Sequence, residues 1–414
     1  MRATSHLPIF AVFIVALAGC GDEGQSKVPD SRTTIVLAAP LQGPDGPLGR
    51  DTVRAARMQL KAEGLPESGP DSIRLAVLDE SDPSAEGFNP EHVASLVSDA
   101  LESGSPVVAW VGGIDSDTLA VELPRLNEVG VIAVSPSASG LPFTQADPAF
   151  PGAPIKYYPA IATFGVTFAR TASTDIAIAG KMLSDLRRRG ITRVLTVDGG
   201  DTAGDSYSSA VEQLAPRSGI TLVGHESVPA GNADWEGIAA EADTLRAQAI
   251  IWTGSPGVAQ ASFWSTIKDS RAEQLMVTGP AVPPGFLQSL PAVTGGTIGY
   301  SGALPSALQG SQGARLEKLF KEEWGWLPTP GALRGAAAMK AVLRALSSAR
   351  HAGEHPIPSL DALRLRVTDE LRRVRTVNSL LGPIRLDAAG NWPTAPVGAW
   401  KAAPGGPVFV GVLP

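Results

Sequence analysis

The chain has 414 residues, of which 43% are hydrophobic and 18% are charged, and its formal net charge is −7. A chain of this length and composition can form two domains with large cores. Its negative charge argues against a broad role on nucleic acid or on an anionic lipid surface, so small molecules or proteins are the expected partners.

The N-terminus has the pattern of an export signal. A basic start at Arg2 precedes an apolar run at 9–18, and residues 17–20 (LAGC) match a lipobox. The run is shorter than the roughly 20 residues that a spanning helix needs, which favours a cleaved leader over the alternatives, an uncleaved anchor or a buried core cysteine. We expect residues 1–20 to be signal peptide and lipobox, and Cys20 to carry the lipid that attaches the protein to the membrane.

Cys20 is the only cysteine, so an intramolecular disulfide and a cysteine-rich metal site are excluded. The polar segment 21–32 is expected to be a flexible tether, and the folded part to start near Thr33. The five histidines show no HExxH spacing, and 351 and 355 are expected on a surface loop. The sequence therefore predicts no metal site and no cofactor.

From residue 34 onward, short apolar runs alternate with amphipathic stretches, which indicates βαβ units with parallel strands. The first helix is expected at 51–63 with Asp51 as its cap, because Val53, Ala56 and Leu60 share one face. Strands of this first series are expected at 35–39, 73–78, 107–111 and 131–134, and a further helix at 118–128.

A second series follows an irregular, proline-rich segment at 142–159. Its expected strands are 193–197, 221–225, 249–253 and 275–278, and its helices start at Asp175, Asp205 and Trp235. Three more helical patterns at 314–324, 332–350 and 360–374 precede short terminal strands. Two successive α/β units predict two lobes.

Seven motifs occur along the chain in a fixed order. They are 35–44 (IVLAAPLQGP), 79–83 (DESDP), 111–116 (VGGIDS), 130–139 (GVIAVSPSAS), 157–159 (YYP), 168–170 (FAR) and 381–390 (LGPIRLDAAG). In this order they resemble the leucine/isoleucine/valine-binding family, the type I periplasmic binding proteins of branched-chain-type amino-acid ABC importers. The resemblance covers nearly all of the chain after the tether.

The resemblance implies an α/β fold of two Rossmann-like lobes joined by three crossover strands, a venus flytrap with the ligand in the cleft between the lobes. The crossovers are expected near 163–170, 297–303 and 379–384. Lobe one would comprise 33–168 plus 304–379, and lobe two 169–303 plus 380–414.

The resemblance also implies a site for an α-carboxylate. Ser116 precedes a helix-like stretch, where its hydroxyl and the first N–H groups can face an anion. Ser137 and Ser139 match the positions that hold the carboxylate and, through a backbone carbonyl, the ammonium group. The alternative interpretation is that Ser116 is a helix cap and that the other two serines form a turn.

Three matched positions depart from the family. Its acidic residue falls at Ala281, and its aromatic residues fall at Ser255 and Leu48. Burying an ammonium group without a carboxylate is unfavourable. Either Asp175 or another acid (Asp201, Asp205) supplies the charge, or the ligand is not an ordinary α-amino acid. The alternative for each aspartate is a solvated helix start.

Two short motifs raise the question of an enzyme. Residues 204–206 (GDS) and 265–268 (STIK) resemble hydrolase and acylase nucleophile motifs, but the first lacks the following apolar partner and the second has no downstream Lys-Thr-Gly. We therefore expect no enzymatic activity, with an acyl hydrolase as a remote alternative.

The expected function is that of an exported solute-binding lipoprotein, monomeric and without cofactor. It would bind an amino acid or a related small carboxylate and present it to an ABC permease. It would be anchored on the outer face of the cytoplasmic membrane, or lie in the periplasm if the cell has an outer membrane. The alternative is a sensing or structural lipoprotein of the same fold that has lost transport.

Overall fold

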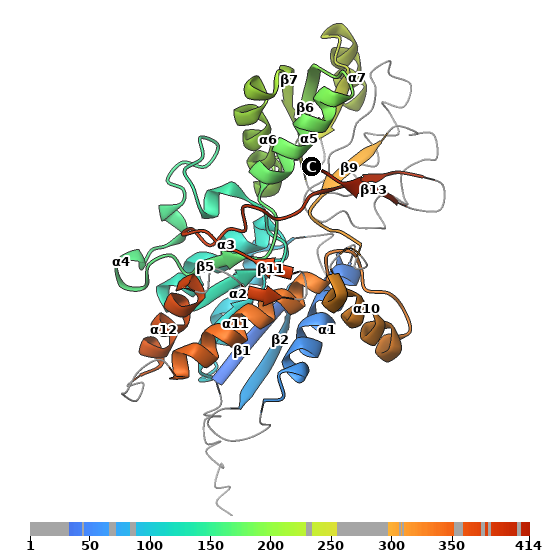
Figure 1. The fold of residues 1–414 in the computed structure, drawn as a ribbon. Helices are drawn as coiled ribbons and strands as arrows, with labels where there is room; N and C mark the ends of the chain where they lie inside the picture. The colour runs from blue at the N-terminus through green and yellow to red at the C-terminus, as the bar shows by residue number, and fades with distance from the viewer. Residues whose placement is uncertain are drawn as a thin grey trace, which may run out of the picture.

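A computed structural model describes residues 33–43, 45–65, 72–82, 88–228, 234–254, 297–305, 308, 310–351, 359–373, 377–379, 382–403 and 407–414. These residues form two groups of strands and helices that lie one above the other in Figure 1. We call the group around β1 lobe one and the group around β6 lobe two. The chain is thus a two-lobed α/β protein.

Lobe one is built on a parallel sheet of five strands in the order β2-β1-β3-β4-β5. The strands are β1 (Thr33–Ala39), β2 (Ile73–Asp79), β3 (Val107–Val111), β4 (Ile132–Ser135) and β5 (Phe168–Arg170). β1 and β3 are buried throughout, as expected for parallel strands covered on both faces. The sequence patterns predicted β1, β2, β3 and β4 to within two residues at each end.

Helices cover both faces of this sheet. Ile35 and Leu37 of β1 pack with α1 (Gly46–Ala62), α11 (Leu333–His351) and α12 (Leu360–Arg373). Val36 and Ala38 point to the other face, which is covered by α2 (Pro90–Glu102) and α3 (Ser116–Glu128). This alternation is the two-residue period of a strand. α10 (Gly310–Trp324) packs beside α1 and α11.

Two predictions for lobe one are wrong in detail. α1 begins at Gly46 rather than at residue 51, and Asp51 is not its cap: the Asp51 carboxylate accepts hydrogen bonds from the Thr329 N–H (2.9 Å) and hydroxyl (2.8 Å). His351 is the last residue of α11 and not part of a loop. Residue 355 lies outside the described residues.

Lobe two contains a parallel sheet and an antiparallel sheet of three strands each. The parallel sheet has the order β7-β6-β8, with β6 (Arg193–Asp198), β7 (Thr221–Ser227) and β8 (Ala249–Trp252). The antiparallel sheet has the order β13-β12-β9, with β9 (Ile298–Ser301), β12 (Gly398–Lys401) and β13 (Val408–Val412). The expected strand at 275–278 lies outside the described residues.

Three helices accompany these strands: α5 (Asp175–Arg188), α6 (Thr202–Leu214) and α7 (Trp235–Thr244). α5 and α6 share one core with β9 and β12, and α7 shares another with β6 and β8. α6 begins three residues before the expected Asp205, because the Asp201 side chain caps it by accepting from the Gly204 N–H (2.6 Å).

The remaining short elements lie at the junction and the surface. They are η1 (Leu141–Phe143), η2 (Ile155–Tyr157), α4 (Ile161–Phe164), η3 (Pro216–Ser218) and the hairpin of β10 (Val377–Ser379) and β11 (Gly382–Ile384).

The end of the chain contributes to both lobes. Ile384, Leu386 and Trp392 pack in the core of lobe one, whereas Val397 and Ala399 pack in that of lobe two. The exact lobe limits and crossovers stay predictions. Among the described residues, no helix is long and apolar enough to cross a membrane.

Candidate ligand-binding site

Three serines meet at the carboxyl end of the lobe-one sheet, where ligands bind in open α/β folds. Ser116 is the first residue of α3, and its hydroxyl oxygen accepts from the Gly140 N–H (3.2 Å). Ser137 and Ser139 follow β4, and the Ser137 hydroxyl donates to the Ile114 carbonyl. All three are at most 6% exposed. The structure therefore brings the three predicted serines into one buried cluster.

Ser116 is not the cap of α3. That position belongs to Asp115, whose carboxylate accepts from the N–H (2.7 Å) and hydroxyl (2.9 Å) of Thr118. The Ser116 hydroxyl thus accepts from the Gly140 N–H and keeps its own hydrogen to donate.

Lobe two brings Asp175 to the same cluster. Asp175 is the first residue of α5, its N–H donates to the Ser139 carbonyl (3.1 Å), and its carboxyl accepts from the Ser206 hydroxyl (2.6 Å). It is 1% exposed, so the interpretation as a solvated helix start is wrong for Asp175. Burial raises the pKa of Asp175 above its ordinary value, although hydrogen bonds from Ser139 and Ser206 oppose the shift.

The first turns of α3 and α6 also meet between the lobes. The Asp117 carboxylate accepts from the Thr202 N–H (2.7 Å). Burial and the nearby carboxylates of Asp115 and Asp201 raise the pKa of Asp117 to about 7. The contact between the lobes therefore depends on an acid that titrates near neutral pH.

Two buried glutamates lie beneath α3. Glu80 follows β2 and is 5% exposed, and Glu122 on α3 is fully buried. The Glu122 carboxyl accepts from the Trp110 indole N–H (2.8 Å). Burial, with a smaller effect of Asp115, raises the pKa of Glu122 to about 8, and burial and Glu122 raise that of Glu80. At least one of the two acids is therefore protonated at neutral pH.

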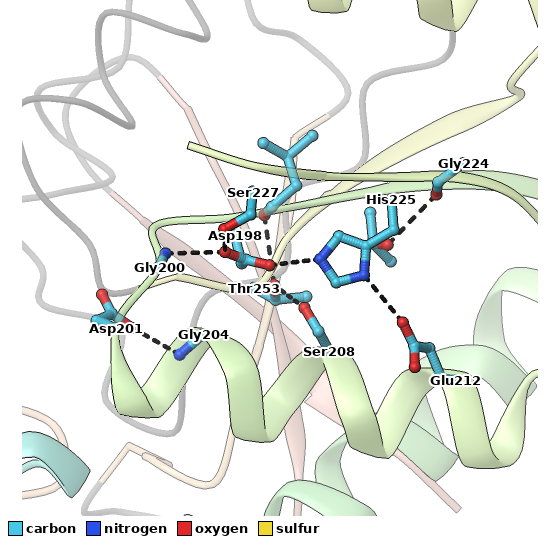
Figure 2. Close-up of polar contacts among 12 residues, drawn as sticks. Asp198, Gly200, Asp201, Gly204, Ser208, Glu212, Gly224, His225, Ser227 and Thr253 are labelled. Carbon is cyan, nitrogen blue, oxygen red and sulfur yellow. Dashed lines mark hydrogen bonds and ion pairs between the residues drawn. The ribbon is translucent and has the colours of Figure 1, made fainter. Parts of the chain in front are cut away.

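On the lobe-two side, a network of charged groups holds the turn between β6 and α6. Figure 2 shows His225 between Asp198 and Glu212, with ring nitrogen to carboxylate distances of 2.5 and 2.9 Å. Asp198 also accepts from the Gly200 N–H (2.8 Å) and the Ser227 hydroxyl (2.7 Å). The hydrogen bond to Asp198 raises the pKa of His225 to about 9, so the ring is charged at neutral pH.

This network has no nucleophile. The Ser208 hydroxyl beside it bonds to Thr253 (2.6 Å), and the Ser227 hydroxyl donates to Asp198 rather than to His225. Ser206 of the GDS motif is bonded to the Leu141 N–H and to Asp175, neither of which is a histidine. The geometry positions the first turn of α6 and offers no activated hydroxyl.

The other matched positions have different outcomes. Leu48 is 5% exposed and belongs to the lobe-one core. Ser255 and Ala281 lie outside the described residues.

Asp117 and Ser206 are junction residues that the sequence did not single out for binding, although the GDS motif contains Ser206. Among the described residues no group of acids, histidines or cysteines could hold a metal ion.

Comparison with known proteins identifies the fold. A family model described as "Periplasmic binding protein" matches residues 33–406. The chain belongs to this family. Its two lobes form the venus-flytrap fold that is seen in solved periplasmic binding proteins, among them a leucine-binding protein.

Several solved structures of periplasmic binding proteins match along nearly their whole length. A leucine-binding protein from Thermotoga maritima is 18% identical, with a TM-score of 0.72 and coverage of 92% of this chain and 98% of that one. An ABC-transporter solute-binding protein from R. palustris in complex with benzoate is 17% identical, with a TM-score of 0.67 and coverage of 92% and 96%.

An ABC-transporter substrate-binding protein from Desulfitobacterium hafniense in complex with leucine is 17% identical, with a TM-score of 0.66 and coverage of 92% and 99%. No curated protein matches this periplasmic binding protein. The fold and the family follow from these comparisons, and the ligand does not.

Proposed function

We propose that this periplasmic binding protein is a lipid-anchored solute receptor of an ABC importer and that it binds an amino acid or a related small carboxylate between its lobes. The observation that carries the proposal is the convergence of Ser116, Ser137 and Ser139 from lobe one with Asp175 from lobe two. The cluster lies where the two lobes meet, so one ligand can contact both.

The cluster suits a carboxylate better than an ammonium group. Hydroxyl groups and the first turn of α3 can donate to an anion. The Ser139 carbonyl, which the family resemblance assigns to the ammonium, already accepts from the Asp175 N–H. The neighbours whose names include benzoate or leucine support a small carboxylate as the ligand class.

One series of experiments identifies the ligand and tests where it binds. The mature chain is screened by thermal shift against amino acids, small carboxylates, amides and short peptides, and the best compound is titrated by calorimetry. Because a hydrogen bond to a charged group contributes roughly 1.5 to 3 kcal/mol, Ser139→Ala should weaken binding by about ten- to a hundredfold. Ser184→Ala, on the exposed side of α5, serves as the control.

Leucine, isoleucine and valine should bind weakly in the same assay. Sub-micromolar binding of leucine, or unchanged affinity of Ser139→Ala for the best compound, would contradict the placement of the site. Permease and ATPase genes next to this one would favour transport over the sensing or structural role.

The lipid anchor is tested separately at Cys20. Because Cys20 is the only cysteine, Cys20→Ala should abolish labelling by radioactive fatty acid and release the protein from the membrane fraction. Labelling of the variant at the level of the wild type would show that the anchor is not a lipid on Cys20.

A further inference from the structure

A buried arginine lies at the junction of the lobes, next to Thr171 and Gly302. Arg334 is the second residue of α11 and is 4% exposed. The first turn of α11 lies at the end of lobe one that faces lobe two (Figure 1). The Arg334 guanidinium donates to the carbonyl of Gly302, which follows β9, and the Arg334 carbonyl lies 3.4 Å from the Thr171 hydroxyl.

The Arg334 side chain lies beside the segment of the chain that leads to Asp175. A Cβ atom on Gly302 would lie 2.4 Å from Arg334 Nη2 and 2.3 Å from Ser173 Oγ, so both groups face the same backbone position. Ser173 stands two residues before Asp175, which is bonded to Ser139.

The charge of Arg334 has no acidic partner among the residues that the structure describes. Its guanidinium donates to a backbone carbonyl, that of Gly302, and burial alone lowers the pKa of Arg334 to about 10. α11 has no acidic residue in its first turn, and the positive end of its dipole adds to the charge. A buried cation in this position is unfavourable unless an anion joins it.

Among the described residues, two other arginines are buried, and both have acids beside them. Arg170, on β5, has the carboxylates of Asp175 and Asp387 near enough to raise its pKa against the effect of burial. Arg364, on α12, pairs with Asp361 (3.3 Å) and donates to the carbonyls of Val107 (2.8 Å) and Val129 (3.0 Å). Among these three arginines, Arg334 is the one without an acid.

We infer that Arg334 is the counter-charge for the ligand carboxylate and that the ligand class is a monocarboxylic acid without an ammonium group. This inference rests on the proposed function. Arg170 already has Asp175 and Asp387 near it, whereas Arg334 has no acid beside it among the described residues. A monocarboxylate supplies the missing negative charge, whereas a zwitterionic amino acid has no net charge and would place its ammonium near the Arg334 guanidinium group.

The test uses pairs of compounds that share a skeleton. Calorimetry on the mature chain compares 4-methylpentanoate with leucine, 3-phenylpropionate with phenylalanine, and benzoate with benzamide. At least one acid should bind wild type tenfold or more tightly than its partner. Arg334→Met should weaken that acid by at least thirtyfold, and Arg334→Lys should restore part of the loss because it keeps the charge. Arg364→Met is the control for a buried arginine remote from the serines.

A readout without ligand accompanies the titrations. Because Arg334→Met removes an uncompensated buried charge, its melting temperature without ligand should be equal to that of wild type or higher. If Arg334→Met does not fold, the affinity of Arg334→Lys for the acid, compared with that of wild type, tests the role of Arg334.

Two failures can be told apart. If an acid binds wild type and Arg334→Met binds it within threefold, or if the amino acids or the amide bind more tightly than their partners, this inference is wrong and the proposed function stands. If no compound of the screen or of these pairs binds wild type, the proposed function fails and the role of Arg334 fails with it.

Discussion

The two lobes meet at edges that are rich in acids, and each lobe accommodates its acids in a different way. In lobe one, Glu80 and Glu122 are buried without a cation among the described residues, and the pKa of Glu122 rises to about 8. In lobe two, Asp198 is equally buried, but His225, the Ser227 hydroxyl and the Gly200 N–H form hydrogen bonds with it, and its pKa falls below the ordinary value in spite of burial.

The two kinds of acid affect the free energy of unfolding in opposite ways as the pH changes. Glu122 prefers the protonated state in the folded protein, so the folded protein binds more protons between about pH 4.5 and 8, and the free energy of unfolding falls as the pH rises through that range. Asp198 and His225 prefer their charged states. Their contribution is lost below the ordinary pKa of Asp198 and, at the other end, as the pH rises to about 9.

The largest expected effect is on the lobe-two network. His225→Ala leaves the buried Asp198 carboxylate without its cation and should lower the free energy of unfolding by about 2 kcal/mol at pH 7, since hydrogen bonds to charged groups contribute roughly 1.5 to 3 kcal/mol. Glu212 is half exposed, so Glu212→Gln should cost less than about 1 kcal/mol. Urea unfolding measures both, and equal effects of the two variants would show that Asp198 does not need the histidine.

A smaller effect of opposite sign is expected in lobe one. Glu122→Gln keeps an acceptor for Trp110 and removes a charge that is costly to bury, so it should stabilise the protein by about 1 to 2 kcal/mol at pH 9 and by less at pH 5. Glu102→Gln, at the exposed end of α2, is the control. Destabilisation by Glu122→Gln at pH 9 would mean that the buried carboxylate is compensated after all.

The smallest effect concerns the contact between the lobes. The pKa of Asp117 is about 7 in that contact, so closing the lobes takes up protons below this pH and closure weakens as the pH rises. If Asp117 has its ordinary pKa in the open state, the affinity for the best carboxylate should fall by up to about tenfold from pH 6 to pH 8, and Asp117→Asn should remove this dependence. A wild-type affinity that is independent of pH would show that the contact is absent in the ligand-bound state.

The sequence predicted the parallel strands well because buried strands carry uninterrupted aliphatic and β-branched runs, as in 107–111. It missed the start of α1, where a proline near the first helical position was an available signal. Long-range contacts could not be predicted. In the sequence, Asp175 resembles the first residue of any helix. Its hydrogen bond from Ser206, 31 residues away, forms only in the folded chain.

In the candidate site, Arg334 likewise could not be identified from the sequence. It stands in an alanine-rich helix start, and only the folded chain reveals that it is buried and which groups surround it. The serine positions came from the family resemblance and Asp175 was a candidate from the sequence, whereas Asp117 came from the structure.

The central claim is that one small carboxylate binds between the two edges, and hydrogen exchange followed by mass spectrometry tests it most directly. With a saturating carboxylate from the screen, the account predicts slower exchange in peptides around 112–141 in lobe one and around 198–208 in lobe two, and little change at 90–102 in α2. Protection confined to one lobe, or protection in neither, would contradict it.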